Sequence, residues 1–202
     1  MPADKSRQLQ VSRDVVFACA MTAEQRAAKR LGSTVRVGLG VANGMPEGDR
    51  LVSFGIAGAL RHGLLIGTVI DATRVVDERG TVLWEGEPLG VVDARHGTIL
   101  GADRIVDDPA ERAALHEVTG ADAVDMESAS LARTGRLAGC IRAISDTPEL
   151  KLAGLAEAAK LDGRVDVRGL VRGFVRAPVE TARAIVAVTR ALRSLQRVVL
   201  AS

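Results

Sequence analysis

The stretch ADAVDMESASLARTGRLAGCIRAISDTPE, residues 121–149, decides the fold. An apolar run at Ala121–Val124 is followed by a helix-like segment, and a second apolar run at Cys140–Ile144 ends in Ser145 and Asp146. The connecting segment has about the length that a parallel crossover needs, and such crossovers are nearly always right-handed. We therefore expect a strand–helix–strand unit of an α/β fold, with both strands pointing the same way.

Two acids, Glu127 and Asp146, come just after these two strands. Ligands of open α/β sheets sit beyond the carboxyl ends of the strands, so we expect both carboxylates to converge on a crevice there. Such a pair suits proton transfer on a hydroxyl-bearing substrate. A structural alternative stays open, because Asp146 followed by Pro148 and Glu149 also resembles a helix N-cap, and Glu127 an acid in a first helical turn.

Composition indicates one ordinary globular domain. Of the 202 residues, 47% are hydrophobic and 26% are charged, and the formal net charge is +2. Aromatic residues make up only 2% and Tyr is absent, which argues against base-stacking platforms for nucleic acid. Cys19 and Cys140 lie in apolar runs without metal-ligand spacing, and no apolar run approaches a membrane span. The polar start MPADKSRQLQ does not resemble a signal peptide, so we expect a cytoplasmic protein.

The other elements follow from apolar periodicity and turn residues. Strands are expected at residues 14–21, 33–40, 51–60, 64–76, 81–84 and 96–103, with a hairpin across the turn at 77–80. Helices are expected at residues 22–31, 109–119 and 150–160. The first of these helices is expected to open with a capping box that runs from Thr22 to Gln25.

The chain is expected to divide into a flexible tail (1–12), an α/β domain (13–163) and an Arg-rich helical extension packed on that domain (164–202). The extension breaks at Pro178 into two amphipathic helices in which arginines outnumber acids. A basic amphipathic helix can dock on an anionic membrane surface. The alternative is that its apolar stripe packs on the domain or on a second subunit while the arginines face water.

Four motifs in order resemble those of the nucleoside phosphorylase and nucleosidase superfamily. They are AMTAE (20–24), SFGIAGAL (53–60), VDMESASLA (124–132) and RAISD (142–146). This superfamily holds purine nucleoside phosphorylases and methylthioadenosine/S-adenosylhomocysteine nucleosidases. The resemblance implies a three-layer α/β/α fold around a central twisted, mixed, largely parallel sheet, and cleavage of the N-glycosidic bond of a purine nucleoside.

The resemblance also implies roles for single residues. Asp146 would protonate the departing base, and Ser145 would help to place Asp146 or the base. Glu127 would hold the ribose hydroxyls, with Met126 packing under the sugar. Glu24 would orient the attacking water, or a sugar hydroxyl if phosphate attacks.

The binding pocket is implied at two further places. Gly55 and Gly58 would let the backbone approach the ribose and the nucleophile closely, and Arg104 and Ile105 fall where relatives line the base pocket. No cofactor is expected. Inorganic phosphate and water both stay open as the nucleophile.

The chain departs from the family pattern in its front half, where only MPEGD separates Gly44 from Arg50 and a long helix is nearly absent. Its Arg-rich tail is most similar to the branch called hopanoid-associated phosphorylase, which implies release of adenine from adenosylhopane. A methylthioadenosine/S-adenosylhomocysteine-type nucleosidase is the alternative, and a degenerate, non-catalytic nucleoside-binding protein is a second one. The resemblance implies a small-molecule nucleoside as partner and a homo-oligomer, without nucleic acid.

Overall fold

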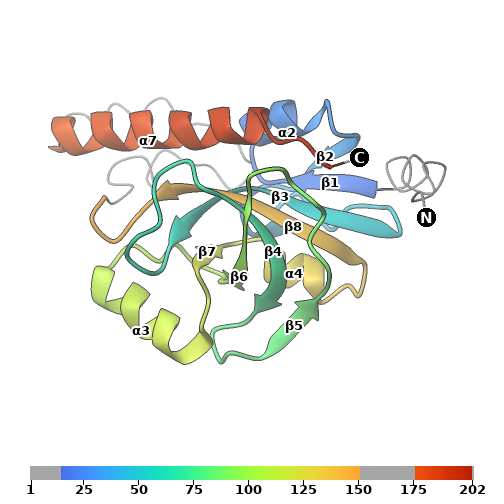
Figure 1. Cartoon of the computed structure of the whole chain (residues 1–202), viewed down its shortest axis with the longest axis horizontal. Coiled ribbons are helices and arrows are strands. Elements are labelled where there is room, and N and C mark those ends of the chain that lie inside the picture. Colours follow the sequence, from blue (N-terminus) through green and yellow to red (C-terminus); the bar gives the residue numbers. More distant parts are fainter. Residues whose placement is uncertain (1–14, 151–175, 202) are drawn as a thin grey trace.

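The computed structural model describes residues 15–150 and 176–201, and there a mixed β-sheet is flanked by helices (Figure 1). This is the expected fold class. The strands are β1 (Val15–Cys19), β2 (Ser33–Arg36), β3 (Arg50–Ala59), β4 (Val69–Val76), β5 (Val82–Glu85), β6 (Arg95–Gly101), β7 (Ala123–Asp125) and β8 (Leu137–Asp146). The helices are α2 (Thr22–Ala28), the 3-10 turn η1 (Leu39–Val41), α3 (Pro109–Thr119), α4 (Ser128–Ala132) and α7 (Pro178–Gln196).

Several expectations fall outside the described residues. They are the tail at 1–12, nearly all of the helix at 150–160, the start of the Arg-rich extension at 164–175 and the domain boundary after residue 163.

Five strands close into a ring of pairings. β3 pairs with β7, β7 with β6, β6 with β4, β4 with β8, and β8 back with β3. On the outside, β1 and β2 continue from β3 as parallel strands, and β5 pairs antiparallel with β4 as the predicted hairpin. The sheet is therefore mixed with parallel pairings in the majority.

The expected parallel crossover between β7 and β8 is wrong. β7 runs antiparallel to β3 whereas β8 runs parallel to it, so the two strands point in opposite directions. The connection contains only α4, a helix of 5 residues, which is short for a crossover that must return along a sheet. The carboxyl ends still meet, because Gly58 of β3 is the register partner of both Val124 in β7 and Asp146 in β8.

The core lies on both faces of β3 and β8. Side chains alternate along a strand, so Cys140 and Ile144 of β8 join the cluster inside the ring, while Ile141 and Ala143 join the cluster on the outer face. Burial on both faces explains why β8 reads as an apolar run. The two cysteines are divided the same way, with Cys19 in the outer cluster and Cys140 in the inner one.

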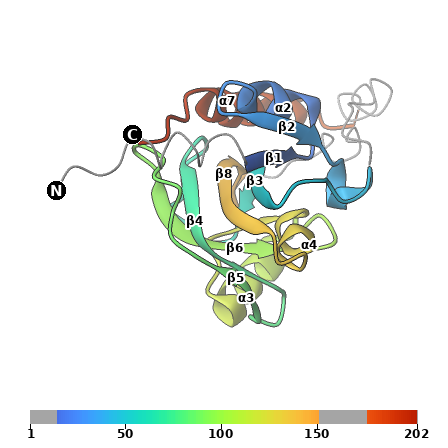
Figure 2. The same cartoon turned by 90° about the vertical axis from the view of Figure 1, so that its right-hand side faces the viewer.

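Helices α2 and α7 lie together over the outer face, and α3 lies on the opposite side of the molecule (Figures 1 and 2). The buried stripe of α7 includes Ala187, Ala191 and Leu195, and the latter two pack into the outer cluster. Full burial of one Leu side chain contributes about 2 kcal/mol, so this stripe holds α7 on the domain. Among the helices in the described ranges, none is long and apolar enough to cross a membrane.

Local capping explains where two helices start. The predicted helix at 109–119 is confirmed as α3, in which the Asp108 carboxylate accepts hydrogen bonds from the first-turn amides and Gly120 ends the helix in the left-handed region. For α2 the capping prediction is one residue late. Met21 is the N-cap and Glu24 accepts from its amide at 2.8 Å.

The structural alternative for Asp146 is also wrong. Asp146 is the last residue of β8, and the chain then makes a tight turn in which Thr147 and Leu150 exchange backbone hydrogen bonds. Asp146 therefore does not cap a helix.

Candidate active site

Three predicted site residues lie beside the segment Gly55–Gly58 of β3, namely Glu24, Ser145 and Asp146. Glu24 Oε1 accepts a hydrogen bond of 2.9 Å from the Ile56 amide. Gly55 makes this possible, because a Cβ atom at that position would lie 2.5 Å from Glu24 Oε1. A glycine at residue 55 is thus required for Glu24 to reach the strand.

Asp146 approaches the other end of the same segment. A Cβ atom on Gly58 would lie 2.7 Å from Asp146 Oδ2, so this glycine also makes room for an acid. The hydroxyl of Ser145 lies 2.6 Å from Asp146 Oδ1 and 3.2 Å from the carbonyl oxygen of Ala57. Ser145 therefore holds the carboxyl of Asp146 in position.

A buried ionic group, the Arg142 cluster, consists of Arg142, Asp125, Glu127 and Glu24. Arg142 projects from the middle of β8 and is 1% exposed. Its Nε donates to Asp125 Oδ2 at 2.6 Å, and its Nη2 donates to Ser53 Oγ at 2.6 Å and lies 3.7 Å from Glu127 Oε2. The cluster holds three acids for one cation, so it cannot be fully ionised at low cost.

Burial sets the protonation of these acids. Desolvation, followed by the negative charge of Asp125, raises the pKa of Glu127 to about 8 despite the attraction of Arg142. Desolvation also raises the pKa of Glu24, again against Arg142. Glu127 can consequently hold or exchange a proton close to neutral pH, as acid–base catalysis requires.

Glu127 is fixed from a second side by the short front half of the chain. Its Oε1 accepts a hydrogen bond of 3.0 Å from the Gly40 amide in η1. In this turn Gly40 has φ 58° and Val41 φ 63°, and the left-handed region is strained for a β-branched residue such as Val41. The strained turn therefore helps to hold Glu127 in place.

Asp146 has its own cation, Arg112 of α3, which is also 1% exposed. Arg112 donates from Nη2 to Asp146 Oδ2, and its other nitrogens bind the carbonyl oxygens of Val106 at 3.0 Å and Ala59 at 3.1 Å. Burial raises the pKa of the Asp146 carboxyl, while Arg112 and the Ser145 hydrogen bond act in the opposite direction. The pKa of Asp146 is thus set by a balance between burial, which favours the protonated form, and Arg112 with Ser145, which favour the ionised form.

Three predicted pocket residues take no part in these contacts. Arg104 is exposed and forms ion pairs with Glu78 and Glu111 on the surface. Ile105 is 42% exposed, and Met126 is half-buried. The structure therefore brings together Glu24, Glu127, Ser145, Asp146, Gly55 and Gly58, but leaves Arg104 and Ile105 at the surface.

Sequence reasoning missed Asp125, Arg112 and Arg142. A charged residue inside the apolar run of a central strand was a usable signal for Arg142, because such a position is buried and requires a partner. Arg112 gave a weaker signal, since an arginine on a short amphipathic helix usually faces water.

Comparison with known proteins finds a family match over the part of the chain that contains three residues of the candidate site. Residues 84–172 match the family model described as Phosphorylase superfamily. This range contains Glu127, Arg142 and Asp146, whereas Glu24 and Gly55 lie before it. No curated protein sequence matches the chain.

Solved structures of nucleosidases superpose on most of the chain. A 5′-methylthioadenosine/S-adenosylhomocysteine nucleosidase from S. pneumoniae has a TM-score of 0.55 at 17% identity, with 88% of this chain and 99% of that chain covered. The corresponding enzyme from Helicobacter pylori has a TM-score of 0.53 at 16% identity, with 91% and 97% covered. That from Colwellia psychrerythraea 34H, in complex with adenine, has a TM-score of 0.53 at 16% identity, with 94% and 98% covered. The chain thus has the fold of the methylthioadenosine/S-adenosylhomocysteine nucleosidases, and its part from residue 84 to residue 172 matches the phosphorylase superfamily.

Proposed function

We propose that the protein cleaves the N-glycosidic bond of a purine nucleoside. The observation that carries this proposal is the Asp146 carboxyl, which is buried, has a raised pKa, and shares the Gly55–Gly58 segment of β3 with Glu24. An acid that keeps a proton in a dry site can deliver it to a leaving group that is too basic to depart as an anion.

The residues divide the reaction between them. Cleavage of a ribosyl N–C bond passes through an oxocarbenium-like state, with positive charge on the sugar and negative charge on the base. Asp146 donates a proton to the base, and Glu127 accepts hydrogen bonds from the ribose hydroxyls and, when ionised, stabilises the positive sugar. Glu24 orients the attacking water, because its carboxyl is held in the first turn of α2 by the amides of Met21 and Ile56. In phosphorolysis, Glu24 binds a sugar hydroxyl instead.

For the substrate we propose an adenine nucleoside with an apolar 5′ substituent, such as adenosylhopane. The similarity of the Arg-rich tail to the hopanoid-associated branch supports this choice. The structural similarity to nucleosidases supports methylthioadenosine or S-adenosylhomocysteine as the alternative substrate. The homo-oligomer, the membrane contact and the cytoplasmic location stay predictions.

One observation favours a second function, binding of a nucleoside without turnover. Arg112 holds Asp146 in a buried ion pair, and an adjacent cation makes a carboxyl group a weaker proton carrier. If Arg112 keeps this contact in the complex, Asp146 recognises the base and does not protonate it.

The test is release of adenine from purified protein. Adenosine, methylthioadenosine and 5′-alkyl adenine nucleosides are incubated with and without phosphate, and free adenine is measured by chromatography. We expect Asp146→Asn to lower kcat by about 10²- to 10⁴-fold with little change in KM, because the lost interaction belongs to the transition state. Asp49→Asn, which removes an exposed carboxylate, is the matched control and is expected to leave the rate unchanged.

The outcomes separate the candidates. Adenine formed only with phosphate identifies a phosphorylase, and adenine formed without phosphate identifies a nucleosidase. Binding without any adenine supports the non-catalytic function. An unchanged rate in Asp146→Asn, with thermal unfolding equal to that of the wild type, removes Asp146 from the proposed role.

A further inference from the structure

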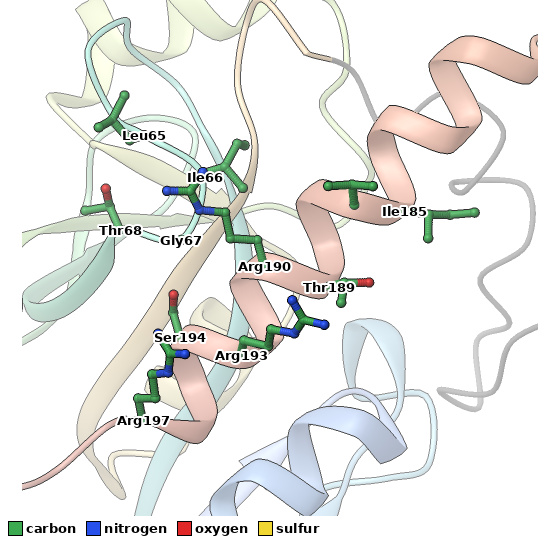
Figure 3. Close-up of a pocket in the computed structure, with 11 residues that line it drawn as sticks. Leu65, Ile66, Gly67, Thr68, Ile185, Thr189, Arg190, Arg193, Ser194 and Arg197 are labelled. Carbon is green, nitrogen blue, oxygen red and sulfur yellow. The ribbon is translucent and has the colours of Figure 1, made fainter.

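A cavity lies away from the acids, between the loop Leu65–Thr68 and helix α7 (Figure 3). Its volume is about 670 Å³, which is enough for a small ligand. We call it the α7 pocket. The loop is fixed on β8, because the Gly67 amide donates to the Ile144 carbonyl at 2.8 Å and the Ile144 amide donates to Thr68 at 2.9 Å. One wall of the pocket is therefore formed before any ligand arrives.

Three arginines line the α7 pocket. Arg190, Arg193 and Arg197 are spaced three and four residues apart, so they follow one face of α7, and Arg190 reaches across to the loop at Ile66 (Figure 3). Among the described residues no acid lines the pocket, and none of the three arginine side chains has a hydrogen bond or an ion pair there. Three neighbouring cations repel one another, and a bound anion relieves that repulsion.

The C-terminus of α7 accounts for only two of the three arginines in the pocket. Arg193 and Arg197 lie in or beside the last turn of α7, where cations are stabilised by the helix dipole. Arg190 lies further from that end. Its stem packs on the loop, since a Cβ on Gly67 would lie 3.4 Å from Arg190 Cγ. The side chain of Arg190 is thus directed into the cavity by contact with the loop.

Hydroxyl groups complete the polar part. Ser194 Oγ lies 2.9 Å from the position that a Cβ on Gly67 would occupy, and Thr68 and Thr189 also line the cavity. The amides of Gly67 and Thr68 are already used in backbone hydrogen bonds. An anion must therefore be held by the guanidinium groups and hydroxyls. Guanidinium groups match the geometry of phosphate oxygens.

The other part of the α7 pocket is apolar and open to water. Leu65 is 72% exposed and Val186 is 68% exposed, and both line the cavity with Ile66 and Ile185. Exposed apolar side chains next to unpaired cations suit a ligand that has both kinds of surface. A simple inorganic anion would leave the apolar part uncovered.

We propose that the α7 pocket binds a phosphate ester with an apolar substituent. The phosphate would contact the three arginines, and the apolar group would cover Leu65 and Val186. The proposal does not depend on the proposed glycosidic activity, because α7 packs on the outer face of the sheet while the Arg142 cluster lies within it. The ligand is either a soluble molecule or the headgroup region of a lipid, which share this chemistry.

Calorimetric titration of the full chain with dihexanoyl phosphatidic acid, kept below its micelle concentration, tests the proposal. We expect binding, about tenfold weaker binding of inorganic phosphate, and no binding of uncharged dihexanoyl glycerol. Arg193→Gln is expected to weaken the binding of dihexanoyl phosphatidic acid by about tenfold. Arg183→Gln is the matched control, because Arg183 is exposed on the same helix but does not line the pocket.

A sedimentation assay distinguishes the two sources. Binding to vesicles of phosphatidylcholine with phosphatidic acid that Arg193→Gln weakens more than Arg183→Gln indicates a lipid headgroup. Binding of the soluble ester alone indicates a soluble ligand. Equal losses in the two variants would overturn the proposal, because they would show a general effect of net charge. If the protein binds neither dihexanoyl phosphatidic acid nor the vesicles, and its thermal unfolding shows that it is folded, the proposal is overturned as well.

Discussion

The Arg142 cluster and the α7 pocket use arginine in opposite ways. Arg142 is 1% exposed and has an acid or a hydroxyl at each of its side-chain contacts. The arginines of the α7 pocket are exposed, and no acid of residues 15–150 or 176–201 lines that pocket beside them. Burial accounts for the difference, because an unpaired charge is costly only where water is excluded. The first region therefore depends on its internal pairing, and the second region is free to pair with a ligand.

Removal of the buried cation should have the largest effect. In Arg142→Met the acids of the cluster lose their counter-charge, and we expect a loss of about 3–5 kcal/mol in the free energy of unfolding. Urea denaturation followed by circular dichroism measures it. Arg74→Gln breaks an exposed ion pair with Glu85 and should cost less than about 1 kcal/mol. Similar losses in the two variants would contradict the contrast between buried and exposed arginines.

A methyl group on β3 should disturb the cluster less. Gly55→Ala puts a Cβ into the place of Glu24 Oε1 and within 3.0 Å of Arg142 Nη1, so we expect a loss of about 1–3 kcal/mol. The same change in a Glu24→Ala background should cost clearly less, because the nearest clash is gone. The double-mutant cycle in urea is the measurement, and additive losses would show that Glu24 does not cause the strain.

Protonation of Glu127 should make stability depend on pH. Its pKa is raised from 4.5 in the unfolded chain to about 8, so the folded state binds the proton more tightly. The resulting stability is fully present below pH 4.5 and is lost as the pH rises through 8. We expect Glu127→Gln, which cannot ionise, to lose less stability than the wild type across this window, by about 1.4 kcal/mol for each unit by which the pKa is raised. Thermal unfolding curves at several pH values check this, and parallel pH profiles for the two proteins would count against the raised pKa.

The smallest effect should come from the α7 pocket. Arg193→Gln removes an exposed charge that has no ion pair in the described part of the chain, so the free energy of unfolding should change by no more than about 0.5 kcal/mol. The same urea experiment measures it. A loss near that of Arg142→Met would mean that Arg193 is part of the fold and not of a binding surface.

The elements were accessible from sequence because they depend on local signals. Asp108, Pro109 and Gly120 mark both ends of α3, and apolar runs mark β1, β3 and β8. The direction of β7 relative to β8 was not accessible. It depends on closure of the strand ring and on the shared partner Gly58, which are long-range pairings without a local pattern.

Three acids of the candidate site were predictable, whereas Asp125 and the two buried cations were not. The family resemblance pointed to Glu24, Glu127 and Asp146, and the structure brings each of them to a buried position. Arg112 and Arg142 are needed to hold those acids in the interior, and this requirement appears only when burial is known. Arg104, predicted beside the base, is paired instead with Glu78 and Glu111, because α3 and the loop after β4 present acids to it on the surface.

Cys19 and Cys140 lie on two sides of the sheet, so their thiols can report separately on local unfolding of the outer and the inner cluster. Burial raises the pKa of both thiols, that of Cys140 to about 12, so neither is reactive while its surroundings stay closed. Chemical labelling of each thiol will then report the rate at which the outer or the inner cluster admits solvent. A protein in which α7 detaches before the strand ring opens would label Cys19 first, and the order of labelling would reveal the sequence of unfolding without any substitution.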